Sequence, residues 1–374
     1  MKVKIDPALL GGHSIIIRHM VKGVDCPLAA IDPDDSPIEV CGAPWHQKGR
    51  LFCRIPEEEL QGTDVNSGVI TSGAFNSAGI ILRFKTNSNI VGIRALLSYN
   101  NDTKRMLQEG KNGFAFYSGT GKDKVLRYLV PPPDERETYF TFAAGDMGAG
   151  EQETEWTIYC PLVTAIHYIR VLVSHEAEIA SPTPFAVEKP VLFYGSSVTN
   201  GIAASNPANV YTALLGRWLD VNIYNWGFNG SCKGEADLAK LIGRMDLAAF
   251  FMCFDNNAPN AQFIQERHKP FFDLVRKAQP KLPIIIVSRP EVHTDIAVYE
   301  GGDRKRAVRS TYEQALASGD ENVYFIDGET LVDVNQKEAS TVDGCHPNDF
   351  AFYHIAKGIR PTLEMVLKKY GYLK

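Results

Sequence analysis

The second half of the chain alternates strand-like and helix-like segments, and this pattern restricts its fold more than any other feature. Five short apolar runs typical of buried strands are separated by segments with the amphipathic period of helices. Strands that alternate with helices in this way form a parallel sheet covered on both faces. We therefore predict a doubly wound α/β domain. The predicted strands are 191–194, 221–226, 248–254, 283–288 and 323–326, and the predicted helices are 210–219, 235–245, 261–278, 304–317 and 348–369.

The first half has a different pattern, typical of antiparallel strands. Residues 80–85 alternate apolar and basic side chains, as expected for a strand with one buried face. Short runs of this kind, separated by Asn, Gly, Asp and Pro clusters, predict a β-sandwich of jelly-roll type. The Pro-containing segment 181–184 indicates a hinge, so we expect an all-β domain at 1–185 and an α/β domain at 186–374. The other predicted strands are 90–99, 113–117, 125–130, 138–142 and 156–173, the last broken at Pro161.

Composition and charge exclude several classes of function. The 374 residues include 39 basic and 44 acidic side chains, a net charge of -5 without a basic cluster, so nucleic acid is not an expected partner. No apolar run is long enough to cross a membrane or to act as a signal peptide, and we expect a cytoplasmic protein. The seven cysteines are scattered and form no Cys-x-x-Cys pair, so neither disulfides nor a zinc site is expected. The segment 119–122 lacks the leading glycine and the Ser or Thr of a phosphate loop.

Small polar residues follow the ends of three predicted strands and precede the last predicted helix. They form four clusters, each of which alone is typical of a turn or a helix cap. Because parallel α/β sheets bind ligands at the carboxyl ends of their strands, four such clusters in this order indicate a shared site. The clusters are Gly195-Ser196-Ser197, Asn225-Trp-Gly-Phe-Asn-Gly230, Asp255-Asn-Asn-Ala-Pro259 and Asp343-Gly-Cys-His346-Pro-Asn348.

These clusters resemble the four sequence blocks of the SGNH (GDSL-type) hydrolase superfamily, which contribute one Ser, one Gly, one Asn and one His. The matching residues here are Ser197, Gly227, Asn257 and His346, and the Asp-x-x-His arrangement of the family begins at Asp343. The resemblance implies a flavodoxin-like catalytic domain with a serine nucleophile.

The first half resembles the N-terminal domain that precedes one bacterial SGNH group and is named for a Gly-x-Asp-Leu-Tyr motif. Two residues depart from the family patterns. Ser196 stands where the opening block usually has Asp, although that group commonly shows Gly-Ser-Ser. Ala115 replaces the Asp of the N-terminal motif, so any role of that carboxylate is lost. The matching segments are 43–45, 49–51, 54–56, 77–79 and 113–117.

The residue types agree with the mechanism of a serine hydrolase. A serine hydroxyl needs a base, and Ser197 and His346 are the predicted nucleophile and base. Asp343 is expected to orient the imidazole and to stabilise the imidazolium. The backbone N–H groups of Ser197 and Gly227 and the Asn257 amide are the predicted oxyanion donors, each worth about 3–4 kcal/mol of barrier. Glycine is expected at 227 because a side chain there would block the acyl group.

The resemblance implies a serine esterase that needs no metal or organic cofactor and acts on small acyl groups, with O-acetyl groups on carbohydrates favoured. The same blocks permit a lysophospholipase, thioesterase or aryl esterase, and a glycan-binding protein on an inactive SGNH scaffold is a further alternative. Arg289, at the end of the fourth strand, either binds substrate or pairs with a nearby acid. Trp45 and Trp226 either stack on sugar rings or serve packing. A homo-oligomer is left open.

Overall fold

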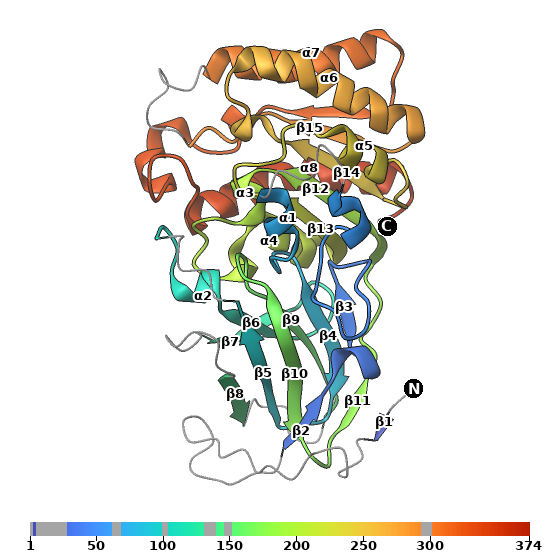
Figure 1. Cartoon of the computed structure of the whole chain (residues 1–374), viewed down its shortest axis with the longest axis vertical. Helices are drawn as coiled ribbons and strands as arrows, with labels where there is room; N and C mark the ends of the chain where they lie inside the picture. Colours follow the sequence, from blue (N-terminus) through green and yellow to red (C-terminus); the bar gives the residue numbers. More distant parts are fainter. Residues whose placement is uncertain are drawn as a thin grey trace.

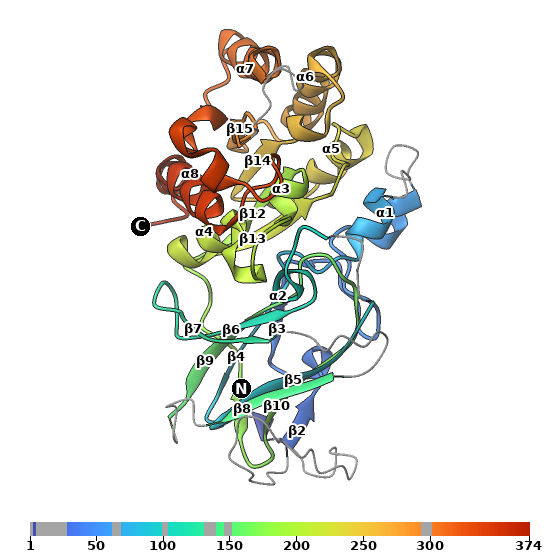
Figure 2. The ribbon, with the colours of Figure 1, turned by 90° about the vertical axis from the view of Figure 1, so that its left-hand side faces the viewer.

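The structure is a computed structural model of the full chain and describes residues 3–4, 28–61, 69–98, 104–130, 140–145, 152–292 and 301–374. Two layered parts lie end to end along the long axis of the molecule, with the α/β part above the β-rich part in Figure 1. Figure 2, turned by 90°, shows two sheets facing each other in the lower part.

A five-stranded parallel sheet forms the centre of the α/β part. Its strands are β12 (Val187–Gly195), β13 (Val221–Gly227), β14 (Ala249–Cys253), β15 (Ile284–Val287) and β16 (Val323–Ile326). They are hydrogen-bonded in the order β13-β12-β14-β15-β16, and every pair is parallel. The sheet therefore extends in both directions from β12, which is the flavodoxin-like strand order. The predicted doubly wound α/β fold is confirmed.

Helices cover both faces of this sheet because its strands are apolar on both sides. Along β12, Phe193 packs into the core beneath α4 and α8, whereas Tyr194 packs into the core beneath α5 and α6. The helices α6 and α8 begin after Asn260 and Asn348, whose side-chain oxygens accept backbone N–H groups three residues later. The helices are α4 (Tyr211–Leu219), α5 (Ala236–Ile242), α6 (Ala261–Ala278), α7 (Gly301–Ala317) and α8 (Asp349–Lys369).

The β-rich part consists of two antiparallel sheets around one apolar core that includes Phe84, Ile93, Trp156 and Val171. The first sheet has the order β1-β11-β4-β9-β6-β7, with β3 also paired to β4, and the second has the order β2-β10-β5-β8. This is the expected antiparallel architecture, while its jelly-roll connectivity and the boundary at 185 stay predictions. The strands are β1 (Val3–Lys4), β2 (Leu28–Ile31), β3 (Glu39–Cys41), β4 (Ile81–Thr86), β5 (Ile90–Leu97), β6 (Phe114–Ser118), β7 (Val125–Val130), β8 (Phe140–Gly145), β9 (Thr154–Tyr159), β10 (Ile166–Ser174) and β11 (Glu178–Ala180).

A buried arginine joins the two parts of the molecule. Arg54, from the β-rich part, donates to the carbonyl oxygens of Asn225 at 2.8 Å and Gly73 at 2.6 Å, and its guanidinium lies 4.7 Å from the Phe228 ring centroid. Burial lowers the pKa of Arg54 to about 10. In return, the indole N–H of Trp226 donates to the Arg54 carbonyl oxygen at 2.8 Å. The β-rich part therefore packs directly on the end of β13. Two short helices, α1 (Val69–Ala74) and α2 (Gln108–Lys111), lie where the β-rich part meets the α/β part (Figures 1 and 2).

Candidate active site

The predicted nucleophile lies where β12 passes into the one-turn helix α3 (Ser197–Asn200). Ser196 caps this helix, because its hydroxyl oxygen accepts the N–H of Val198 at 3.2 Å. Ser196 therefore shapes the turn, as the sequence suggested, and Ser197 is the first residue of the helix. A Cβ atom on Gly195 would overlap the Thr199 hydroxyl, so this residue must be glycine for α3 to turn back over the strand.

Three predicted catalytic side chains form a continuous chain of hydrogen bonds. The Ser197 hydroxyl lies 3.0 Å from His346 Nε2, and His346 Nδ1 lies 2.9 Å from Asp343 Oδ2. The other carboxylate oxygen accepts the N–H groups of His346 at 2.8 Å and Cys345 at 3.1 Å. Burial raises the pKa of Asp343, but the N–H group and ring of His346 outweigh this effect, and the net pKa lies below its usual range. Asp343 is therefore ionised and able to hold a protonated imidazole.

The loop that carries Asp343 and His346 is held largely by its own hydrogen bonds. Thr341 and Pro347 form an isolated antiparallel bridge, and the Val342 N–H donates to the His346 carbonyl oxygen at 3.0 Å. The side chain of Asn348, which caps α8, donates to the Ala339 carbonyl oxygen at 2.7 Å. His346 thus faces Ser197 from a compact loop rather than from a helix or strand.

Of the three predicted oxyanion donors, the Gly227 N–H at the end of β13 and the Asn257 amide just after β14 each already have a partner in the protein. The Gly227 N–H donates to Asn225 Oδ1 at 2.9 Å, so its expected role requires sharing or release of this bond and stays a prediction. The Asn257 side-chain amide donates to the Phe228 carbonyl oxygen at 3.3 Å, which leaves its second N–H for a ligand. A Cβ atom on Gly227 would overlap the Asn200 backbone, so glycine is needed for packing against α3.

Asn225 is a structural residue of the site that sequence reasoning did not single out. Its amide N–H groups donate to the Thr199 carbonyl oxygen at 2.7 Å and to the Thr212 hydroxyl at 3.1 Å. It therefore ties β13 to the nucleophile helix α3 and to α4. The only signal in the sequence was its place at the start of the cluster that contains Gly227.

Comparison with known proteins agrees with this arrangement. Residues 188–364 match the GDSL-like lipase/acylhydrolase family. Residues 29–179 match the N-terminal domain of SGNH-hydrolase-type esterases. The chain is an SGNH hydrolase. Both resemblances inferred from the sequence are confirmed, and so is its class as an esterase-type enzyme. Among curated proteins, none matches this hydrolase.

Solved structures share the fold of this SGNH hydrolase over most of its length. A protein described as a GDSL-like lipase, from Bacteroides ovatus, is 23% identical with a TM-score of 0.79, covering 91% of this chain and 98% of its own. The salicylyl-acyltransferase SsfX3 of a tetracycline biosynthetic pathway is 16% identical, with a TM-score of 0.72. The match covers 91% of this chain and 97% of SsfX3. A family two carbohydrate esterase from Clostridium thermocellum, in complex with cellohexaose, is 14% identical, with a TM-score of 0.54. The match covers 80% of this chain and 94% of the esterase.

Arg289 of the hydrolase is enclosed rather than presented to solvent. Only 3% of its side chain is exposed, and Nη2 lies 3.5 Å from a carboxylate oxygen of Glu291. Its backbone N–H donates to the buried carboxylate of Asp255 at 3.0 Å. Burial raises the pKa of Asp255 despite the neighbouring Arg289 and Arg304. This geometry favours the ion-pair interpretation of Arg289, and its contact with substrate stays a prediction.

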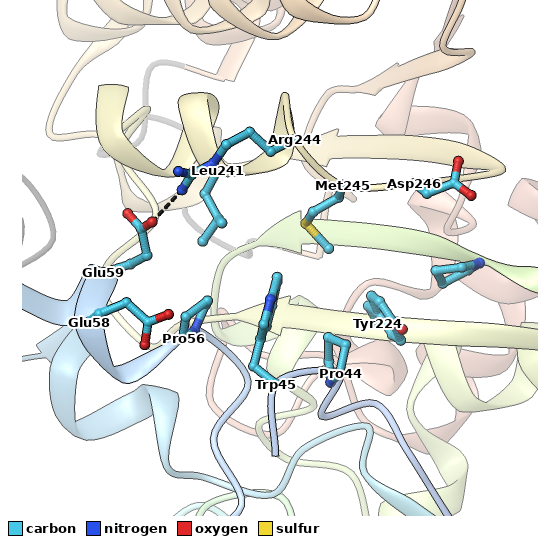
Figure 3. Close-up of a pocket in the computed structure, with 11 residues that line it drawn as sticks. Pro44, Trp45, Pro56, Glu58, Glu59, Tyr224, Leu241, Arg244, Met245 and Asp246 are labelled. Carbon is cyan, nitrogen blue, oxygen red and sulfur yellow. Dashed lines mark hydrogen bonds and ion pairs between the residues drawn. The ribbon is translucent and has the colours of Figure 1, made fainter. Parts of the chain in front are cut away.

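The two tryptophans of interest lie on the α5 face of β13. Trp226 is fully buried, whereas Trp45 is half-buried, with its ring centroid 5.9 Å from that of Trp226. Trp45 lines a cavity of about 450 Å³. Figure 3 shows it among the lining residues, with the ion pair between Glu59 and Arg244 at one side. Trp226 therefore serves packing. The residues that line the cavity include no predicted catalytic residue, so Trp45 is not placed to hold the reacting ester.

Metal-binding clusters and membrane-spanning helices are both absent from the described residues. In that part of the chain, no group of three or more His, Cys, Asp or Glu side chains is arranged to hold a metal ion. No described helix combines the length and the apolar character needed to span a membrane. The segment Gly119–Lys122 that distantly resembles a phosphate loop is part of the turn between β6 and β7.

Proposed function

We propose that this SGNH hydrolase is a serine esterase that removes small acyl groups, with O-acetyl esters of carbohydrates as its substrates. The observation that carries the proposal is the chain of hydrogen bonds from Ser197 through His346 to Asp343, with distances of 3.0 and 2.9 Å. Serine becomes a nucleophile when a neighbouring base accepts its proton, and a carboxylate on the far side of that base stabilises the imidazolium. The base and the carboxylate lie in this order beside Ser197, which supports the proposal.

The proposed reaction has two steps. Ser197 Oγ attacks the ester carbonyl carbon while His346 Nε2 takes its proton, and the resulting oxyanion accepts hydrogen bonds from the Ser197 N–H and the Asn257 amide. His346 then returns the proton to the departing alcohol, which leaves an acyl group on Ser197. In the second step, water loses a proton to His346 and attacks the acyl carbon. The bond between that carbon and Ser197 Oγ then breaks, the proton passes to Ser197 Oγ, and the carboxylic acid leaves. Asp343 stays ionised throughout.

The choice of substrate rests on analogy. A family two carbohydrate esterase from Clostridium thermocellum, in complex with cellohexaose, shares the fold over 80% of this chain, which supports a sugar ester as the substrate. A lysophospholipase or thioesterase would need a long apolar acyl channel, and no residue pattern argues for one. A glycan-binding protein without activity would not need the aligned Ser197, His346 and Asp343.

The first test compares hydrolysis of p-nitrophenyl acetate by wild type and Ser197→Ala. We expect wild type to turn over and the variant to lose about 10⁴-fold or more of kcat. Ser196→Ala is the matched control, because it removes a neighbouring hydroxyl that caps α3 and leaves the nucleophile in place. Equal rates in wild type and Ser197→Ala would refute the assigned nucleophile.

A second experiment tests the substrate. Acetylated oligosaccharides and long-chain lipid esters are compared by kcat/KM with the wild-type enzyme. We expect the acetylated sugars to be far better substrates. Comparable rates for both classes would reject the carbohydrate assignment while leaving the esterase mechanism intact.

A further inference from the structure

We propose that Arg105, which belongs to the β-rich part of the molecule, is a positioning residue for the triad carboxylate Asp343. The inference rests on the proposed function and deepens it. The Arg105 Nε atom lies 2.6 Å from Asp343 Oδ2, the oxygen that also accepts the His346 imidazole. One oxygen of the carboxylate therefore binds both the catalytic base and a cation from the other domain. The β-rich domain thereby completes the active site.

The segment that carries Arg105 is anchored on the catalytic domain. Met106 is buried in the same apolar cluster as Ile202 and Ala204, a few residues after the nucleophile. At α2, a Cβ atom on Gly110 would overlap the Ala204 carbonyl oxygen, so the two backbones are in direct contact. The Leu162 N–H donates to the Gly110 carbonyl oxygen at 3.3 Å and fixes α2 within its own domain. Arg105 thus begins from a fixed backbone position and reaches Asp343 with its side chain.

The other hydrogen bonds of the Asp343 carboxylate show which contact Arg105 contributes that the triad loop does not. Oδ1 is held by the N–H groups of Cys345 and His346, both within the triad loop. Arg105 is the one described contact to this carboxylate from outside that loop. Arg105 therefore ties the orientation of the Asp343 carboxylate to the β-rich domain, whereas the N–H groups of Cys345 and His346 tie it only to the triad loop.

The charge on Arg105 has a further consequence for the base. A cation beside Asp343 repels a positive charge on the neighbouring imidazole, so replacing Arg105 by a neutral residue should make that ring easier to protonate. Within the described residues, the titratable group next to this pair is the Cys345 thiol, which interacts electrostatically with Asp343, Arg289 and Arg105. The Arg105 side chain is 60% exposed and that of Asp343 is 17% exposed, so solvent and salt screen part of the effect.

The experiment measures kcat and KM of p-nitrophenyl acetate hydrolysis across pH for wild type, Arg105→Ala and Arg105→Lys. Lys104→Ala is the matched control, because it removes a neighbouring exposed cation with no described contact to Asp343. For Arg105→Ala we expect kcat to fall about 2–5-fold with KM little changed, the range set by exposed ion pairs. The acid limb of the plot of kcat against pH should move to higher pH by about 0.2–0.7 unit. Arg105→Lys should restore part of both effects, and high salt should reduce them.

A second readout does not depend on catalysis. NMR titration of the His346 ring in wild type and Arg105→Ala gives its pKa directly, and we expect a higher value in the variant. If wild type hydrolyses esters but Arg105→Ala shows neither the pKa change nor the kcat change, the inference is overturned. A loss of kcat with an unmoved acid limb would indicate a merely structural role and also overturn it. If wild type hydrolyses no ester but the His346 pKa still moves, the proposed function fails and the coupling of Arg105 to the pair stands.

Discussion

The two sides of the proposed catalytic centre are held in place by different means. Ser197 follows a fully buried strand end, and the helix that carries it packs so closely on the ends of β12 and β13 that Gly195 and Gly227 have no room for a side chain. His346 and Asp343 lie on a partly exposed loop that is held by hydrogen bonds and by Arg105. Packing thus fixes the nucleophile, whereas polar contacts fix the base. Apart from Ser197 itself, substitutions on the first side should act through folding, whereas those on the second should act through chemistry.

Gly227→Ala should have the largest effect on the nucleophile side. The new methyl group would overlap the Asn200 backbone, so α3 must move and carry Ser197 with it. We expect a loss of about 1–3 kcal/mol of stability and of most activity, measured by thermal unfolding and p-nitrophenyl acetate turnover. Gly302→Ala, in the first turn of α7, is the control and should be neutral or slightly stabilising. Unchanged stability and activity in Gly227→Ala would remove the packing argument.

Asp343→Asn should have the opposite character, with a stable fold and a severe loss of activity. The amide keeps the shape of the carboxylate but cannot stabilise a protonated His346, so we expect kcat to fall by about 10⁴. Circular dichroism and thermal unfolding should stay close to wild type. A loss of less than tenfold would mean that His346 works without this carboxylate.

Asn257→Ala should lower kcat less, because it removes one oxyanion donor among several. We expect a decrease of about 10²–10³-fold with little change in KM. The Asn257 side chain is half-buried and its described hydrogen bond, to the Phe228 carbonyl oxygen, is long at 3.3 Å, so we expect little change in stability. Steady-state kinetics with p-nitrophenyl acetate measures the effect, and full activity would exclude Asn257 from the oxyanion site.

The last prediction concerns stability alone, on the packed side. His268 of α6 is buried with its ring stacked 5.0 Å from Phe254, and burial lowers its pKa to about 3. Between about pH 3 and 6.5, the unfolded chain binds a proton at His268 that the folded protein does not bind, because the histidine pKa is about 6.5 in the unfolded state. Its contribution to stability is therefore lost as pH falls from about 6.5 toward 3, by about 1.4 kcal/mol per pH unit. Denaturant unfolding of wild type and His268→Gln between pH 4 and 7 should show a shallower pH dependence in the variant.

The sequence predicted the packed side of the site far better than the contacts between domains. The helix expected at 261–278 is α6 with the same bounds, and the strand expected at 323–326 is β16, because amphipathic period and apolar runs report burial directly. The short strands β1, β2, β3 and β11 were not predicted, since two to four residues carry no period and these segments, unlike β16, do not lie between predicted helices.

Contacts between distant residues could not be predicted in this way. Arg54 bonds to Asn225, 171 residues later, and Arg105 reaches Asp343 across the same domain boundary. Neither arginine differs locally from a surface residue in an ordinary loop. The bond between Asn225 and the Gly227 N–H is equally invisible, because a motif names the glycine and not what its N–H contacts.

The buried Arg54 also limits how this enzyme can be divided or recombined. Its described acceptors are carbonyl and side-chain amide oxygens on both domains, and the Trp226 indole depends on the Arg54 backbone for its own acceptor. A catalytic domain produced alone would lack Arg54 and would expose the oxygen atoms that it binds on Asn225 and Asn200, together with the rings of Trp226 and Phe228. A graft of another β-rich domain would have to supply an arginine at the same point. For protein engineering, the two domains are therefore a single unit.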